Sequence, residues 1–154
     1  MSDQVSNNVK PETLYRIGEA ADILGVSVAL LRLYEREGLI IPQRKSSRHR
    51  LFTYHDLERV RCIRETINNR KVSIAGIKRL LSLIPCWKIR SCPEQERAHC
   101  PGYTNTEAAC WTVPGRAWEC RTDNCRQCPV YTELSDCSTL KSTIIRYTSS
   151  ARSA

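Results

Sequence analysis

The sequence predicts a mainly α-helical protein in two parts, a helical amino-terminal domain and a loop-rich module that contains most of the cysteines. Up to Pro85, apolar residues recur at helical spacing, and the segments that hold them are bounded by capping residues and glycines. Beyond Pro85 this periodicity stops, and eight of the nine cysteines fall between Cys86 and Cys137. We therefore divide the chain into a disordered arm at 1–13, a helical domain at 14–85, a cysteine-rich module at 86–137, and a short helix and tail at 138–154.

The first two helices are expected to form a helix-turn-helix. Apolar residues recur at helical spacing from Ile17 to Leu24, and Gly25 follows them as a C-terminal stop. Ser27 can act as the N-cap of a second helix, which Gly38 ends. Two short helices joined by so short a turn match the helix-turn-helix pattern.

The next segment is strongly basic and precedes two further helices. Residues 41–52 contain four basic side chains and no acidic one, which indicates a basic loop or short hairpin. Thr53 and Asp56 have the spacing of a capping box at the start of a third helix. Ser73 caps a fourth helix, and Pro85 closes it. The domain thus contains four helices and a small wing.

Composition limits the partners and the compartment. The chain has 24 basic and 16 acidic residues, and its net charge of +8 favours polyanionic partners such as nucleic acid. Its start does not resemble a signal peptide, and no apolar run reaches the roughly 18 residues of a membrane span. We therefore expect a cytoplasmic protein that does not enter a membrane. Thiols stay reduced in that compartment, so the cysteines indicate metal ligation or redox sensing rather than permanent disulfides. Cys62, in the third helix, is expected to be a small buried hydrophobe.

The helical domain carries a recognisable succession of motifs. In order, it contains Tyr15-Arg-Ile-Gly-Glu-Ala-Ala, Gly25-Val-Ser, Leu31-Arg-Leu-Tyr-Glu-Arg-Glu-Gly38-Leu-Ile-x-Pro42 and Arg50-Leu-Phe. This succession closely resembles the DNA-binding domain of MerR-family regulators over about residues 14–84. The resemblance implies a winged helix-turn-helix, a homodimer on a near-palindromic operator in double-stranded promoter DNA, and an indirect effect on RNA polymerase through distortion of the promoter. One departure is that Pro85 and the cysteines occupy the place of the family's long dimerisation helix.

Candidate DNA contacts come from the second helix and the basic segment. The second helix can enter a major groove, and the basic side chains that follow it can lie near phosphates. The alternative for the basic segment is a solvated loop without a partner. The motif that carries the resemblance adds two tyrosines, an arginine and a phenylalanine. The candidate DNA-binding residues are Tyr15, Arg16, Ser27, Val28, Arg32, Tyr34, Arg44, Lys45, Arg48, Arg50 and Phe52.

The cysteine spacing favours a metal centre without fixing its type. Only Cys125 and Cys128 form a CxxC pair, so an ordinary zinc ribbon is not indicated. Cys120, this pair and Cys137 match the C-x4-C-x2-C...C spacing of plant-type ferredoxins. The Cys-Trp and Cys-Pro steps are similar to small cysteine-rich modules appended to bacterial signalling proteins. We predict an iron–sulfur cluster, with zinc as the alternative and reversible disulfides or inert thiols also open. The candidate ligands are Cys86, Cys92, Cys100, Cys110, Cys120, Cys125, Cys128 and Cys137.

These features predict a transcriptional regulator that senses redox state, gas or metal through a cysteine-ligated centre. The alternative is a constitutive DNA-binding protein whose module holds structural zinc. A thiol oxidoreductase that uses Cys125 and Cys128 is disfavoured, because no strand-helix-strand pattern surrounds them and no general base is evident. We therefore expect no enzymatic activity. No internal repeat is evident, although Cys86-Trp87 is echoed at Cys110-Trp111.

Overall fold

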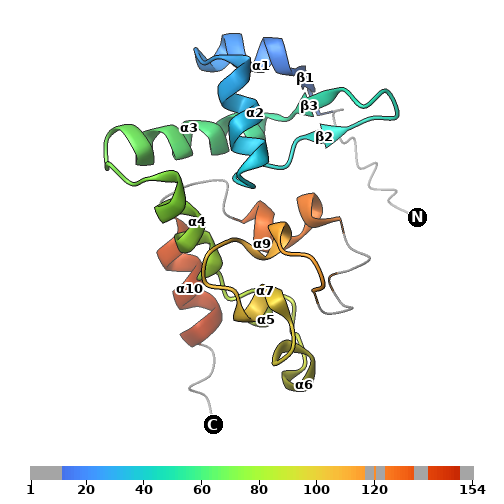
Figure 1. The fold of residues 1–154 in the computed structure, drawn as a ribbon, viewed down its shortest axis with the longest axis vertical. Helices are drawn as coiled ribbons and strands as arrows, with labels where there is room; N and C mark the ends of the chain where they lie inside the picture. Colours follow the sequence, from blue (N-terminus) through green and yellow to red (C-terminus); the bar gives the residue numbers. More distant parts are fainter. Residues whose placement is uncertain (1–11, 117–119, 121–123, 134–138, 150–154) are drawn as a thin grey trace, which may run out of the picture.

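The computed structural model describes residues 12–116, 120, 124–133 and 139–149 (Figure 1). A helix-turn-helix with a wing occupies the upper part of the view, and the cysteine-rich module lies below it. Most of the predicted arm at 1–13, the last residues of the predicted tail and Cys137 lie outside the described residues. No helix in the described part of the chain is both long enough and apolar enough to cross a membrane.

The predicted helix-turn-helix is present. Helix α1 spans Ile17–Leu24, and helix α2 spans Val28–Arg36. Gly25 ends α1 with a φ of 63°, a left-handed conformation that suits glycine. The Ser27 side chain caps α2 by accepting a hydrogen bond of 3.1 Å from the Leu30 amide.

The basic segment forms the predicted hairpin within a small antiparallel sheet. Strand β2 spans Gln43–Arg44 and strand β3 spans Arg50–Phe52. A third strand, β1 at Tyr15–Arg16, completes a sheet of order β1-β3-β2. Tyr15 lies opposite Phe52, so β1 ties the start of the domain to the wing. We did not predict this strand, because its two residues carry no alternating pattern of their own.

The third and fourth helices begin at the predicted caps. Helix α3 spans Tyr54–Asn68, and the Thr53 amide donates to Asp56 Oδ2 over 2.7 Å in the expected capping box. Helix α4 spans Ile74–Ser82, and the Ser73 side chain caps it. The core of the domain lies between these helices and the sheet. Its fully buried members include Ala20, Leu31, Leu39, Phe52 and Val60.

Where the structure describes it, the cysteine-rich module forms single helical turns, as the loop-rich prediction implied. They are α5 at Cys86–Ile89, α6 at Glu94–Arg97, α7 at Pro101–Thr104, the 3₁₀ turns η1 at Cys110–Thr112 and η2 at Cys125–Gln127, and α9 at Pro129–Thr132. Helix α10, at Thr139–Ser149, follows. It lies within the segment 138–154, for which a short helix and tail were predicted. Ile84 and Val130 are the buried centre of a second, much smaller core.

Candidate functional site

The exposed face of α2 is the candidate surface for the major groove. Ala29, Arg32 and Arg36 are exposed and recur three to four residues apart, so they lie on one side of the helix. Ser27 is exposed beside them, while its hydroxyl is already used as the cap. Val28 is half-buried and packs against the core, so only part of it is accessible. Arg36 was missed by sequence reasoning, although its position one turn after Arg32 was the available signal.

The predicted phosphate contacts Arg44 and Arg50 both bind Glu35 of α2. Arg44 donates to Glu35 Oε1 over 2.6 Å, and Arg50 forms a second ion pair with Oε2. Burial raises the pKa of Glu35, but hydrogen bonds from Arg50 and Arg44 bring the pKa below its ordinary value. The carboxylate therefore holds the wing against α2, and the two arginines have a structural role that we did not predict.

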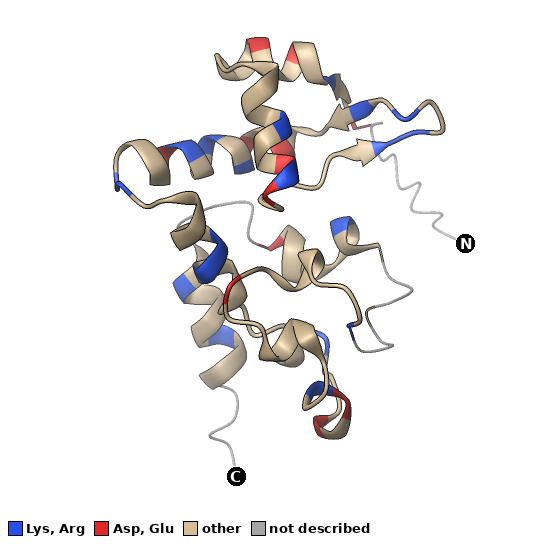
Figure 2. Cartoon of the chain, viewed as in Figure 1, with Lys and Arg blue, Asp and Glu red and all other residues tan. Residues whose placement is uncertain are grey.

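The tip of the wing carries the freely accessible positive charge. Lys45 and Arg48 are exposed at the turn between β2 and β3, where the Arg48 amide donates to the Lys45 carbonyl over 2.9 Å. Figure 2 shows basic residues along the wing and on α2 and α3. The tip thus extends positive charge beyond α2, in the position from which a wing can reach phosphates.

Four further candidates lie in the strands β1 and β3 and in helix α2. Arg16 is exposed in β1, whereas Tyr15 is half-buried and packs against the core. Phe52 is fully buried, so its prediction as a DNA contact was wrong. Tyr34 is only 3% exposed, and burial raises the pKa of its hydroxyl. We assign both rings to the hydrophobic core, where they support α2 and the wing from within.

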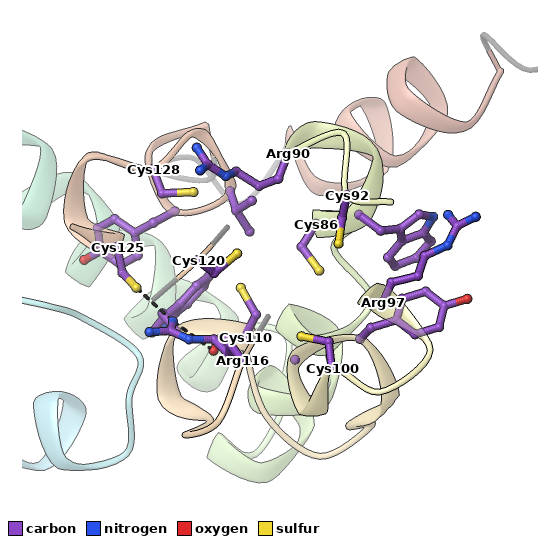
Figure 3. A pocket seen from close by; sticks show the side chains of 16 residues that line it. Cys86, Arg90, Cys92, Arg97, Cys100, Cys110, Arg116, Cys120, Cys125 and Cys128 are labelled. Carbon is purple, nitrogen blue, oxygen red and sulfur yellow. Dashed lines mark hydrogen bonds between the residues drawn. The ribbon is translucent and has the colours of Figure 1, made fainter. Parts of the chain in front are cut away.

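In the module, the cysteine side chains surround one cavity. Figure 3 shows sulfur atoms from several short turns facing a shared space, among them those of Cys86, Cys100 and Cys110. Seven of the predicted ligands line this cavity and form no disulfide, and they come from α5, η1, η2 and the segments between the helical turns. They are Cys86, Cys92, Cys100, Cys110, Cys120, Cys125 and Cys128.

The thiols have charged and hydrogen-bonding neighbours. Arg116 donates to Cys125 Sγ over 2.9 Å, and Arg90 and Arg97 also line the cavity. A hydrogen bond between the Cys86 and Cys110 thiols lowers the pKa of Cys86 and raises the pKa of Cys110. The guanidinium groups can therefore offset negative charge on thiolates. As the described side chains stand, no three His, Cys, Asp or Glu residues form a group that could hold a metal ion.

The two remaining cysteines differ from these seven. Cys62 is half-buried and disulfide-bonded, so its prediction as a buried free thiol was wrong. Sequence spacing gave no signal for this bond, because Cys62 lies in α3, well before the other cysteines. Cys137, predicted as a ligand, lies outside the described residues.

The walls of the cavity reveal a repeated unit that sequence reasoning missed. The Trp87 and Tyr103 rings meet edge to face with centroids 5.1 Å apart, and Trp111 and Tyr131 meet in the same way at 5.2 Å. Each unit reads Cys-Trp followed later by Cys-Pro-x-Tyr, with the proline at the start of a helical turn. The recurrence of Cys-Pro-x-Tyr beside the echoed Cys-Trp step was the signal available.

The second unit packs against the helix-turn-helix domain. Trp111 Nε1 donates to the Gly38 carbonyl over 2.7 Å. Arg59 of α3 donates to the carbonyls of Leu39 and Tyr131, each over 2.9 Å. Its guanidinium carbon also lies 4.0 Å from the centre of the Tyr131 ring. The cavity and the end of α2 are therefore joined by buried polar contacts.

Comparisons with known proteins agree with the geometry of the first domain. Residues 15–84 match the family model described as MerR HTH family regulatory protein. The chain contains a MerR-family helix-turn-helix domain. The chain is 41% identical over 70 residues to the HTH-type transcriptional regulator MlrA of Escherichia coli, a match that covers 45% of this chain and 28% of MlrA. It is 40% identical over 76 residues to the regulator HmrR of Sinorhizobium medicae, covering 49% of each chain.

The likeness to these relatives covers about half of this chain. The regulator GlnR of Bacillus anthracis is 31% identical over 68 residues, which covers 44% of this chain and 52% of GlnR. The chain thus spans about half or less of the length of these relatives. No solved structure was found to match the chain.

Proposed function

We propose that this protein is a MerR-type transcriptional regulator that binds promoter DNA through α2 and the wing. The exposed face of α2, with Arg32 and Arg36, is the single observation that carries the proposal. Its length and charge suit entry into a major groove, while Lys45 and Arg48 at the wing tip suit contact with flanking phosphates. The relatives of the MerR domain, which are named as transcriptional regulators, support the same assignment.

We also propose that the cysteine-lined cavity holds a thiolate-ligated metal centre, most simply an iron–sulfur cluster, that makes the regulator responsive to redox state, gas or metal. Seven cysteines that form no disulfide line the cavity, more than the four ligands of a single structural zinc ion. Nearby arginines can balance the charge of an anionic centre, and aromatic rings can shield it from water. A cluster bound there would supply a reversible change of charge.

The proposed regulator acts as a dimer that distorts its promoter, and so affects RNA polymerase indirectly. Exposed apolar side chains directly after α4 and on α10 support a contact between two copies. Leu83, directly after α4, is 57% exposed and Ile145 on α10 is 51% exposed. A dimer formed through these side chains would bind phosphates on both sides of a deformed DNA site. Sedimentation equilibrium of the full chain, with Leu83→Glu as the interface variant, tests the dimer, and a monomeric wild type would contradict it.

The experiment that tests the sensor joins two measurements on protein purified without oxygen. The first is the content of iron, acid-labile sulfide and zinc, together with the visible spectrum. The second is the affinity of the protein for a DNA duplex, which the same purified protein has first selected from a pool of random sequences. This affinity is measured before and after the metal is removed. Stoichiometric iron and sulfide, together with a change in affinity for the duplex, support the proposal. Zinc without iron, and equal behaviour in both states, would instead favour a constitutive DNA-binding protein with structural zinc.

A further inference from the structure

One short segment of the module both lines the cysteine cavity and contacts the wing. Cys125 and Cys128 line the cavity, and the side chain of Arg126 between them reaches the MerR domain. Tyr131 follows one turn later, and its ring also lines the cavity. The segment from Cys125 to Tyr131 therefore contacts both the cysteine cavity and the DNA-binding domain.

Arg126 forms an ion pair with Asp56 at the start of α3. Its two terminal nitrogens donate to the two carboxylate oxygens of Asp56 over 2.9 and 2.6 Å. The second of these nitrogens also lies 3.3 Å from Thr53 Oγ1. The Asp56 side chain is 4% exposed and the Arg126 side chain 14% exposed. Burial lowers the pKa of Arg126, but the hydrogen bond with Asp56 raises it above its ordinary value. This largely buried, bidentate ion pair is a strong charge-assisted contact, and it fixes the orientation of the guanidinium.

The same segment holds the other end of the wing at Ile41. Arg126 donates to the Ile41 carbonyl, and the Tyr131 hydroxyl accepts a hydrogen bond of 2.9 Å from the Ile41 amide. Ile41 lies just before β2, and Thr53 lies directly after β3. Both ends of the wing, where it leaves α2 and where it enters α3, are therefore bound by two residues of the cysteine module.

We infer that Arg126 and Tyr131 form a strap that carries the state of the cysteine centre to the wing. This inference rests on the proposed metal centre. When Cys125 and Cys128 are ligated, the 3₁₀ turn η2, which begins at Cys125, is fixed, and Arg126 holds the two ends of the wing at Ile41 and Thr53. When ligation is lost, η2 loosens, the strap releases Ile41 and Asp56, and the wing moves relative to the exposed face of α2. The spacing between wing and recognition helix is thereby the output of the sensor.

Hydrogen exchange of the wing ends tests the strap directly. The amides of residues 39–53 are followed by mass spectrometry in anaerobically purified protein, before and after treatment with an iron and zinc chelator. Arg126→Gln and Tyr131→Phe are compared with wild type, and Arg61→Gln is the control, because Arg61 is exposed on α3 and pairs with Glu58 of the same helix. Metal content and affinity for the selected duplex are measured on the same samples.

In the metal-bound state we expect the wing ends to exchange roughly ten- to hundredfold faster in Arg126→Gln than in wild type, the range that loss of charged hydrogen bonds implies. Tyr131→Phe, which keeps the ring, should show a smaller change centred on Ile41. The variants should retain wild-type metal content. The ratio of their DNA affinities with and without metal should fall toward one. The Arg61→Gln control should behave as wild type in each measurement.

The outcomes separate the strap from the function on which it rests. If wild type responds to metal removal and Arg126→Gln responds equally, with unchanged exchange at the wing ends, the strap is wrong and the sensor stands. If wild type holds no metal or its affinity never changes, the proposed sensor fails, and the strap fails with it as a signalling element. If Arg126→Gln loses its metal and Tyr131→Phe does not, Arg126 is needed to hold the metal centre. That result would contradict its proposed role in the strap.

Discussion

Arg59 is the buried residue on which the contact between the two parts of the chain most depends. It is 4% exposed, and it donates to the carbonyls of Leu39 in the MerR domain and Tyr131 in the module. Its guanidinium also lies over the rings of Tyr131 and Trp111. Burial lowers the pKa of Arg59, and the nearby Tyr131 and Asp56 act in the opposite direction. The charge is therefore held by oriented carbonyls and aromatic faces.

Replacing this side chain with methionine should be costly. A hydrogen bond to a charged group contributes about 1.5–3 kcal/mol, and a desolvated cation–π contact about 2 kcal/mol. Because methionine retains part of the apolar packing, we expect Arg59→Met to lower the free energy of unfolding by about 3–5 kcal/mol. For a chain of this size that corresponds to a fall in Tm of roughly 6–20 °C.

Urea denaturation followed by tryptophan fluorescence measures this loss, since Trp111 lies beside the guanidinium. Arg61→Met is the matched control on the same helix, because Arg61 is 46% exposed and its pair with Glu58 is a surface ion pair. We expect the control to change stability by less than about 0.5 kcal/mol. Equal midpoints for Arg59→Met and Arg61→Met would refute the reasoning that Arg59 joins the two parts.

Three further substitutions test other parts of the structure. Gly38→Ala should destabilise the protein by more than the about 1–2 kcal/mol of a left-handed alanine, since Gly38 has a φ of 73° and a Cβ there would collide with Thr112; denaturation should show partial rescue by Thr112→Ser, and full stability of Gly38→Ala would contradict this packing. Arg32→Ala should weaken binding of the selected duplex by about 1–3 kcal/mol in anisotropy titrations without altering metal content, whereas unchanged affinity would remove α2 from the DNA surface. The lowered pKa of Glu35 means that its ion pairs stabilise the protein above the ordinary glutamate pKa and that this stabilisation is lost as pH falls through the lower folded value. The stabilities of wild type and Glu35→Gln should therefore converge at acidic pH, and a constant difference down to pH of about 2 would exclude this role.

The MerR domain could be predicted because its signals are local. Gly25, Ser27, Thr53 and Ser73 each mark a helix end through their own backbone or side-chain chemistry, and the structure confirms all four. Strand β1 escaped prediction because its pairing with β3 joins residues far apart in the chain. A strand of two residues has too short a sequence pattern to predict that pairing.

The candidate site was predictable in its residue types but not in its arrangement. Exposed Arg32 followed from helical spacing, whereas the capture of Arg44 and Arg50 by Glu35 depends on how the hairpin folds back over α2. The seven thiols were all foreseen as a group, yet their convergence on one cavity is set by the turns between them. The disulfide at Cys62 likewise depends on a contact in space that spacing along the chain does not encode.

The two Trp–Tyr units explain why composition and packing divide the chain differently. In the first unit, Arg97 of the module lies 5.9 Å from the Tyr103 ring, and Tyr103 is 41% exposed. In the second, the arginine over the ring is Arg59 from α3, and Tyr131 is only 5% exposed. The MerR domain thus supplies to one half of the module the cationic partner that the other half supplies for itself. The composition changes at Pro85, but Arg59 of α3 completes the second unit, so the packing of that unit depends on the MerR domain as well as on the module.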